Sequence, residues 1–243
     1  MRGSNPALNP GTFTSVAGTA TAGMTVQGTI NKTGLLVLLT MASATWTWSL
    51  AAEGSPSVGP LVLLGLLGGL GAALATVFAK RWAPVTAPIY ALLEGLVLGG
   101  VSALYNVASH GIAIQAVGLT FGTLVVMLLA YSAGVIRVTQ RFRTVVVAAT
   151  GAIALFYIVS MALGFFHVGV PMLYSSSPLG IAFSVAVVAI AAFNLAIDFD
   201  FIQAGAAAGA PRFMEWYGAF GVMVTLIWLY LEILRLLSKL RSR

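Results

Sequence analysis

The amino-acid sequence predicts an all-α integral membrane protein with seven transmembrane helices. The first observation is composition: 59% of the 243 residues are hydrophobic and 7% are charged, with a mean hydropathy of +0.99. A soluble domain of this length needs a more polar surface. The second observation is length, because apolar runs of roughly 20 residues, enough for a helix to cross about 30 Å of hydrocarbon, occur in seven places.

The membrane domain is expected to occupy residues 33–243, after a polar, flexible N-terminal tail at residues 1–32 that is rich in Gly, Ser and Thr. Short segments with turn or charge signals separate the apolar runs. The longest separator, Gln203–Tyr217, precedes the last run. The predicted spans are Thr33–Ala51, Gly59–Ala79, Ala87–Val107, Ile112–Ile136, Thr144–Phe165, Leu179–Asp198 and Gly218–Leu237.

Basic residues predict the orientation of these spans. If the spans alternate in direction, every basic residue before the last span falls on one side of the membrane, which the positive-inside rule makes the cytoplasmic side together with the N-terminus. Seven full spans put the basic C-terminal end outside, against this rule, and a re-entrant last segment is the alternative. The residues concerned are Arg2, Lys32, Lys80, Arg81, Arg137, Arg141, Arg143 and Arg212 on the first side, and Arg235, Lys239, Arg241 and Arg243 at the C-terminal end.

Glycines at a spacing of four predict close packing between helices. Small residues at this spacing let two helix backbones approach each other in lipid. They indicate a compact bundle and carry no information about a substrate. The pairs are Gly65 and Gly69, Gly95 and Gly99, and Gly118 and Gly122.

Four of the six acidic residues, Glu94, Asp198, Asp200 and Glu232, lie inside or at the rim of the apolar runs. A carboxylate near the centre of the bilayer costs about 2.5–3.5 kcal/mol on insertion scales. Such groups persist mainly where they face a packed interior or a water-filled path. An ion or proton route is therefore the first hypothesis for this chain.

Asp198 and Asp200 are predicted at the end of the sixth span. Residues two apart on a helix diverge by about 200°, so the two side chains point in different directions. Asn194 shares a face with Asp198, which favours Asp198 for an inward polar cluster and Asp200 for solvent or headgroups. The alternative is that both acids merely end the helix at the interface.

Glu232 lies deep in the last apolar run, and Arg235 three residues later is able to neutralise it as an i,i+3 pair. If Asp198 and Glu232 instead approach each other, two poorly solvated carboxylates cannot both ionise cheaply. Such a pair can share a proton or accept a divalent cation, for which carboxylate oxygens are suitable ligands. Glu94 is either a hydrogen-bonded structural acid or part of the same path.

Lys80 and Arg81, at the cytoplasmic end of the second span, are candidates for a basic latch on this acid pair. The plainer interpretation is that they only anchor the span by the positive-inside rule.

Three stretches of the chain resemble the Bax inhibitor-1 family, also called the transmembrane Bax inhibitor motif family. They are Ala87–Gly99, Asp198 with Ile202 four residues later, and the Leu-Tyr-Leu-Glu sequence that ends at Glu232. The resemblance covers the chain from about Thr33 to Arg243. It implies a seven-helix bundle whose last helix is central, with a pH-sensitive carboxylate pair near the cytoplasmic face, taken here by Asp198 and Glu232, and a basic latch near Arg81 or Lys80.

This resemblance implies a pH-sensitive calcium-permeable leak channel, with calcium and protons as the ions and no cofactor. The sequence departs from the family pattern in having Glu at 232 instead of the usual Asp, a second acid at 200 that is an alternative partner for Glu232, and a longer link before the last helix. The high Ala, Gly and Val content favours a bacterial member in the plasma membrane.

Two other functions remain open from the sequence. One is a proton-coupled secondary transporter, although no internal repeat of the kind common in transporters is evident. The other is a non-conducting protein that binds other membrane proteins, such as a protease, through the charged region Arg212–Glu215. No catalytic motif is present and an enzyme is not expected. The net charge of +6 reflects topology, so no nucleic acid is expected as a partner.

Overall fold

The computed structural model describes residues 23–166 and 175–242, and it confirms the predicted fold class. These residues form seven helices that are long and apolar enough to cross a membrane. The part of the tail before residue 23, with Arg2, lies outside the described residues, as does Arg243. The helices are α2 (Val26–Ala52), α3 (Val58–Phe78), the short 3-10 helix η2 (Lys80–Trp82), α4 (Ala83–Ala108), α5 (Ile112–Ser132), α6 (Gln140–Phe165), α8 (Pro178–Ala207) and α9 (Met214–Arg241).

The first and sixth helices are longer than the apolar runs that predict them. α2 begins at Val26, where the Thr25 side chain caps the helix by accepting a hydrogen bond from the Gly28 N–H. α8 continues to Ala207, about two and a half turns past Asp198. The interpretation that Asp198 and Asp200 merely end this helix is therefore wrong, and the link to α9 is only residues 208–213.

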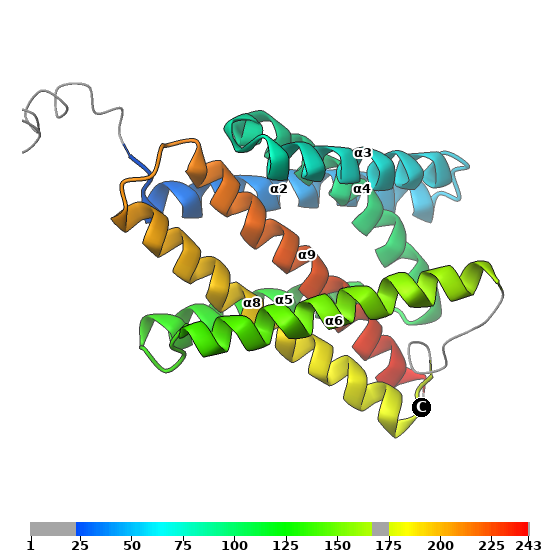
Figure 1. The fold of residues 1–243 in the computed structure, drawn as a ribbon. Helices are drawn as coiled ribbons and strands as arrows, with labels where there is room; N and C mark the ends of the chain where they lie inside the picture. Colours follow the sequence, from blue (N-terminus) through cyan, green and yellow to red (C-terminus); the bar gives the residue numbers. More distant parts are fainter. Residues whose placement is uncertain (1–22, 167–174, 243) are drawn as a thin grey trace, which may run out of the picture.

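The last helix is central in the bundle. α9 packs against α2, α4, α5 and α8, while α3 packs on the outside against α4 and α2. Figure 1 shows α9 crossing diagonally between the layer of α2, α3 and α4 and the helices α5 and α6, with α8 running beside it. Polar side chains in the middle of α9, such as Thr225 and Glu232, are consequently surrounded by other helices.

Close packing holds the layer of α2, α3 and α4 together. A Cβ added at Gly95 or Gly99 of α4 would collide with the backbone of α2, at the Thr40 and Ala44 carbonyls. On α3, a Cβ at Gly65 would lie 2.5 Å from the Leu93 carbonyl oxygen of α4. These glycines therefore act as predicted. Gly118 and Gly122 of α5 do not, because no atom lies within 4 Å of an added Cβ at either position.

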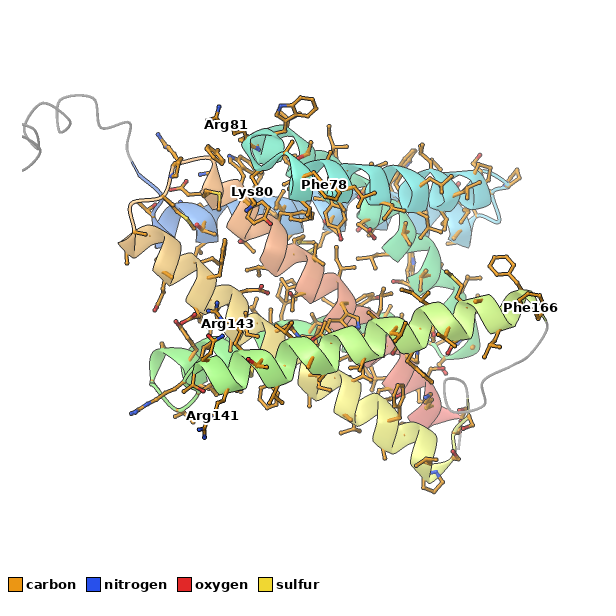
Figure 2. The ribbon with its side chains drawn as sticks, in the orientation of Figure 1. Phe78, Lys80, Arg81, Arg141, Arg143 and Phe166 are labelled. Atoms are coloured by element: carbon orange, nitrogen blue, oxygen red, sulfur yellow. The ribbon has the colours of Figure 1, made fainter. Side chains whose placement is uncertain are left out.

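The basic residues before α9 gather at one end of the bundle. At this end the Met24 N–H donates to the Ala210 carbonyl at 2.7 Å and so ties the start of α2 to the α8–α9 link. Figure 2 shows Lys80, Arg81, Arg141 and Arg143 toward this end, with Phe166 at the opposite end.

The opposite end of the bundle holds the C-terminus of α9. The helix is continuous over 28 residues, so the last segment is not re-entrant. Its basic residues are bonded within the protein: Arg241 donates to the His110 carbonyl at 2.8 Å, and Lys239 donates to the Gly180 carbonyl at 3.0 Å. These contacts account for basic residues at an end where the positive-inside rule does not place them.

Candidate functional site

Three polar residues of α9 form one row along the helix. Thr225, Glu232 and Lys239 are seven residues apart, and seven residues make nearly two full helical turns, so their side chains leave α9 on the same side. Each side chain bonds a polar group of α6 or α8. We call these three residues the α9 polar row.

Asp198 meets the row at Thr225. The Thr225 hydroxyl donates to the Asp198 Oδ2 at 2.7 Å. One turn earlier on α9, Gly221 also lies beside this carboxylate, where an added Cβ would make an ordinary van der Waals contact with the Asp198 Oδ1 at 3.8 Å. Asn194 does not join this contact: its amide donates to the Thr150 hydroxyl of α6 at 2.8 Å. Asp198 and Asn194, which the sequence places on one face of α8, thus bond two different helices, α9 and α6.

Glu232 is the acid of the row, and 2% of its surface is exposed. The Tyr157 hydroxyl of α6 donates to the Glu232 Oε1 at 2.8 Å, and Arg235 Nη1 lies 3.0 Å from both carboxylate oxygens. The Arg235 guanidinium also stacks over the Tyr157 ring at 5.0 Å. The i,i+3 neutralisation considered from the sequence is therefore present, and the cluster carries no net charge when both groups are ionised.

Lys239 completes the row near the end of α9. It is 3% exposed, and its ammonium donates to the Ser184 hydroxyl at 2.9 Å and to the Gly180 carbonyl at 3.0 Å, both on α8. The row therefore runs from an acid contact at Thr225, through an ion pair at Glu232, to a buried cation.

Asp198 and Glu232 do not share one site in this conformation. Asp198 contacts α9 at Thr225, and Thr225 is seven residues from Glu232, which is about 10 Å along the helix. Calcium takes six to eight oxygen ligands, and the described residues contain no group of three or more His, Asp or Glu side chains arranged for a metal ion. The arrangement is two separate acid positions along one row.

Asp200 points away from the row, as the helical geometry predicts. Its carboxylate pairs with Arg143 of α6 at 2.5 Å, and the two side chains are 30% and 44% exposed. It contacts neither Thr225 nor Glu232 through any hydrogen bond that the structure contains among its described residues. Asp200 is thus a surface partner of α6 at the basic end of the bundle.

The candidate latch residues lie outside the row as well. The Lys80 ammonium lies 5.3 Å from the centre of the Tyr217 ring, and Arg81 is exposed at the edge of the bundle (Figure 2). Ion pairs within the described residues join Lys32 to Glu215, Arg143 to Asp200, and Arg235 to Glu232. The cation that holds a row carboxylate is therefore Arg235.

Glu94 is on α4, and its side chain lies against α3. A Cβ on Gly69 would lie 3.1 Å from the Glu94 Oε1, and the side chain is half-buried. Glu94 is therefore not part of the α9 polar row.

Sequence reasoning missed the partners of the row and the role of Glu215. Glu215 is 2% exposed; it accepts hydrogen bonds from the N–H and the hydroxyl of Thr25, both at 2.9 Å, and pairs with Lys32. It is thus unavailable as a surface handle in the region Arg212–Glu215. The seven-residue spacing of the row was a signal present in the sequence, whereas the position of Tyr157 beside Glu232 depends on how α6 docks.

Comparison with known proteins agrees with the geometry of the bundle. The family model described as Bax inhibitor 1 like matches residues 5–242. Neither the curated proteins nor the solved structures contain a significant match to the chain. Since the family match covers nearly the whole sequence, and with it all seven helices, the chain belongs to the Bax inhibitor 1 like family.

Proposed function

We propose that this protein is a pH-sensitive leak channel that is permeable to calcium, with its ion path along the α9 polar row. The observation that carries the proposal is the row itself: polar contacts at Thr225, Glu232 and Lys239 line one side of a helix that other helices surround. Intramembrane acids of this kind mark ion and proton routes. Family membership supports the same function.

In this proposal Asp198 and Glu232 are two successive acid positions that a cation meets along the path. Asp198 lies nearer the basic end of the bundle and has one hydrogen bond from α9, at Thr225. Glu232 is held by Arg235 and Tyr157. We propose that these contacts close the path at Glu232. Arg235 takes the part of the latch that the sequence suggested for Arg81 or Lys80.

In this proposal the protonation state of the two acids, Asp198 and Glu232, supplies the pH sensitivity. A neutral carboxyl group in the path no longer attracts Arg235, and Tyr157 is able to remain hydrogen-bonded to either form of the Glu232 carboxyl group. The Glu232–Arg235 contact then weakens, and the path along α9 opens. Calcium flux should consequently rise as the pH falls.

The orientation that fits this function places the N-terminus and the basic end of the bundle in the cytoplasm, by the positive-inside rule. The membrane is then the plasma membrane of a bacterial cell. No enzymatic activity, cofactor or nucleic-acid partner is part of the proposal.

The test is calcium entry into dye-loaded liposomes that contain the purified protein, measured across a pH series. We expect flux that depends on pH in the parent and loses this dependence in Asp198→Asn and in Glu232→Gln. Asp200→Asn is the matched control, because Asp200 is on the same helix but pairs with Arg143 at the surface. Flux no greater than in empty liposomes at every pH would overturn the channel, and unchanged gating in both variants would overturn the role of the two acids.

A further inference from the structure

A second feature of the membrane domain lies on the opposite side of α9 from the polar row. It is a pocket of about 530 Å³ between α2, α4, α5 and α9. Its floor on α9 includes Met223, Leu226 and Ile227, which leave the helix roughly opposite to Thr225 and Glu232. The proposed ion path does not use this pocket.

Most hydroxyl groups of the pocket lining are already hydrogen-bonded to protein atoms. The hydroxyls of Thr40, Thr45 and Thr120 donate to backbone carbonyls of their own or a neighbouring helix. The Ser102 and Tyr230 hydroxyls bond each other at 2.6 Å. The other lining residues are almost all aliphatic or aromatic. A polar ligand would thus find few partners, and hydrocarbon is the chemistry that fits.

The pocket opens toward the membrane. α2 and α5 form its side walls, and these two helices do not pack closely against each other in the described part of the chain. The rim residues Met41, Ile114 and Val117 are 48%, 79% and 36% exposed, so they face lipid. Along α2 the lining runs from Val37 to Trp48, about 16 Å, which is close to half of the hydrocarbon thickness of about 30 Å.

We propose that this pocket binds one acyl chain of a bilayer lipid, from the leaflet opposite the basic end of the bundle. The apolar lining and the lipid-exposed rim fit a hydrocarbon chain that enters between α2 and α5, and the length of the lining along α2 matches one leaflet. Once bound, it packs against α9 on the side away from the polar row. This site is independent of the channel proposed above.

Trp48 lines the pocket and serves as the reporter. The test uses a protein in which Trp48 is the only tryptophan, reconstituted into vesicles with increasing fractions of a lipid brominated in the middle of its acyl chains, which quenches tryptophan on contact. The pocket-filling variant is Val117→Phe. Leu119→Phe is the matched control, because Leu119 is on the same helix, is 49% exposed and does not line the pocket. The substitutions that isolate Trp48 are Trp46→Phe, Trp82→Phe, Trp216→Phe and Trp228→Phe.

We expect bromine to quench Trp48 strongly in the parent, and quenching to fall by about half in Val117→Phe, because the ring then keeps lipid contact only on its outer side. Leu119→Phe should behave as the parent. A companion protein that retains only Trp46, which is 53% exposed to lipid, checks that every variant is inserted. Equal quenching of Trp48 in the parent and in Val117→Phe would overturn the proposal. Quenching of Trp46 without quenching of Trp48 would also overturn it, since another group would then fill the pocket.

Discussion

α4 is closely packed on several sides, against α2, α3 and α9, whereas among the described helices α6 packs closely only against α8. Twelve residues of α4 are buried, but only Val146 and Ile153 of α6 are. Where α4 meets α2, Gly95 and Gly99 bring the backbones together. Where α6 meets α8 and α9, polar side chains reach across: Thr150 to Asn194, and Tyr157 to Glu232. Backbone packing cannot open without losing many contacts, but polar bridges can exchange partners, so we expect the bundle to open on the α6 side.

The largest expected loss of stability comes from removing the cation that holds Glu232 on the α6 side of the bundle. Arg235→Met leaves a carboxylate that is 2% exposed without a counter-charge, and breaking a buried pair from one side costs about 3–5 kcal/mol. We expect the free energy of unfolding, measured in mixed detergent micelles, to fall by that order. The double variant Glu232→Gln/Arg235→Met should recover most of the loss. A single variant as stable as the parent would mean that the pair does not hold α9.

The second prediction concerns the close-packed side of the bundle. Gly99→Ala adds one methyl group against the Ala44 carbonyl and should destabilise the protein by about 1–3 kcal/mol, as overpacking does. Gly122→Ala is its control, because that position faces open space and alanine favours a helix over glycine. Both are read from the same unfolding titration. Equal stability of the two variants would show that Gly99 does not lie at a close contact between α4 and α2.

A smaller effect is expected at the contact between α8 and α9. Thr225→Val keeps the shape of the side chain and removes its hydrogen bond to Asp198. Hydrogen bonds between helices in membranes contribute about 0.6 kcal/mol on average, so the loss of stability should be of that size. Thr225→Ser retains the hydroxyl and should restore the contact. If Thr225→Val and Thr225→Ser have the same stability, Asp198 is not bonded at this position.

The smallest effect is expected at the surface end of α6. Asp200 and Arg143 are partly exposed, and exposed ion pairs contribute only about 0.2–1 kcal/mol. Asp200→Asn should lower the free energy of unfolding by no more than this, and the difference should shrink as salt is added. An effect well above about 1 kcal/mol would show that α6 is fixed mainly by its surface pair.

The fold follows closely from the sequence because apolar length and turn signals are local properties. The runs that predict α3 and α5 begin within one residue of the observed helices. The apolar run of the sixth span stops at Asp198 because acids lower hydropathy, yet the backbone remains helical through the Ala-rich segment that follows. Hydropathy therefore underestimates the length of a helix that carries acidic residues.

The site was predictable only in part. The sequence placed Asp198 and Glu232 inside the membrane and offered Arg235 as a partner, and these are properties of one helix at a time. It did not predict that Tyr157 bonds Glu232 or that Lys239 bonds polar groups of α8. Those contacts depend on how separate helices dock. The glycine pairs show the same limit: Gly95 and Gly99 meet a neighbouring helix, whereas Gly118 and Gly122, with identical spacing, do not.

Glu215 contacts Thr25 and Lys32, which precede it in the chain by 190 and 183 positions respectively. During synthesis the first helix enters the membrane long before Glu215 leaves the ribosome. Lys32 therefore stays in contact with water until the last helix arrives, and only then does the start of α2 acquire its partner on α9. Assembly of the bundle is thus coupled to the synthesis of α9, because the helix that α2, α4, α5 and α8 surround is the last of the seven described spans along the chain.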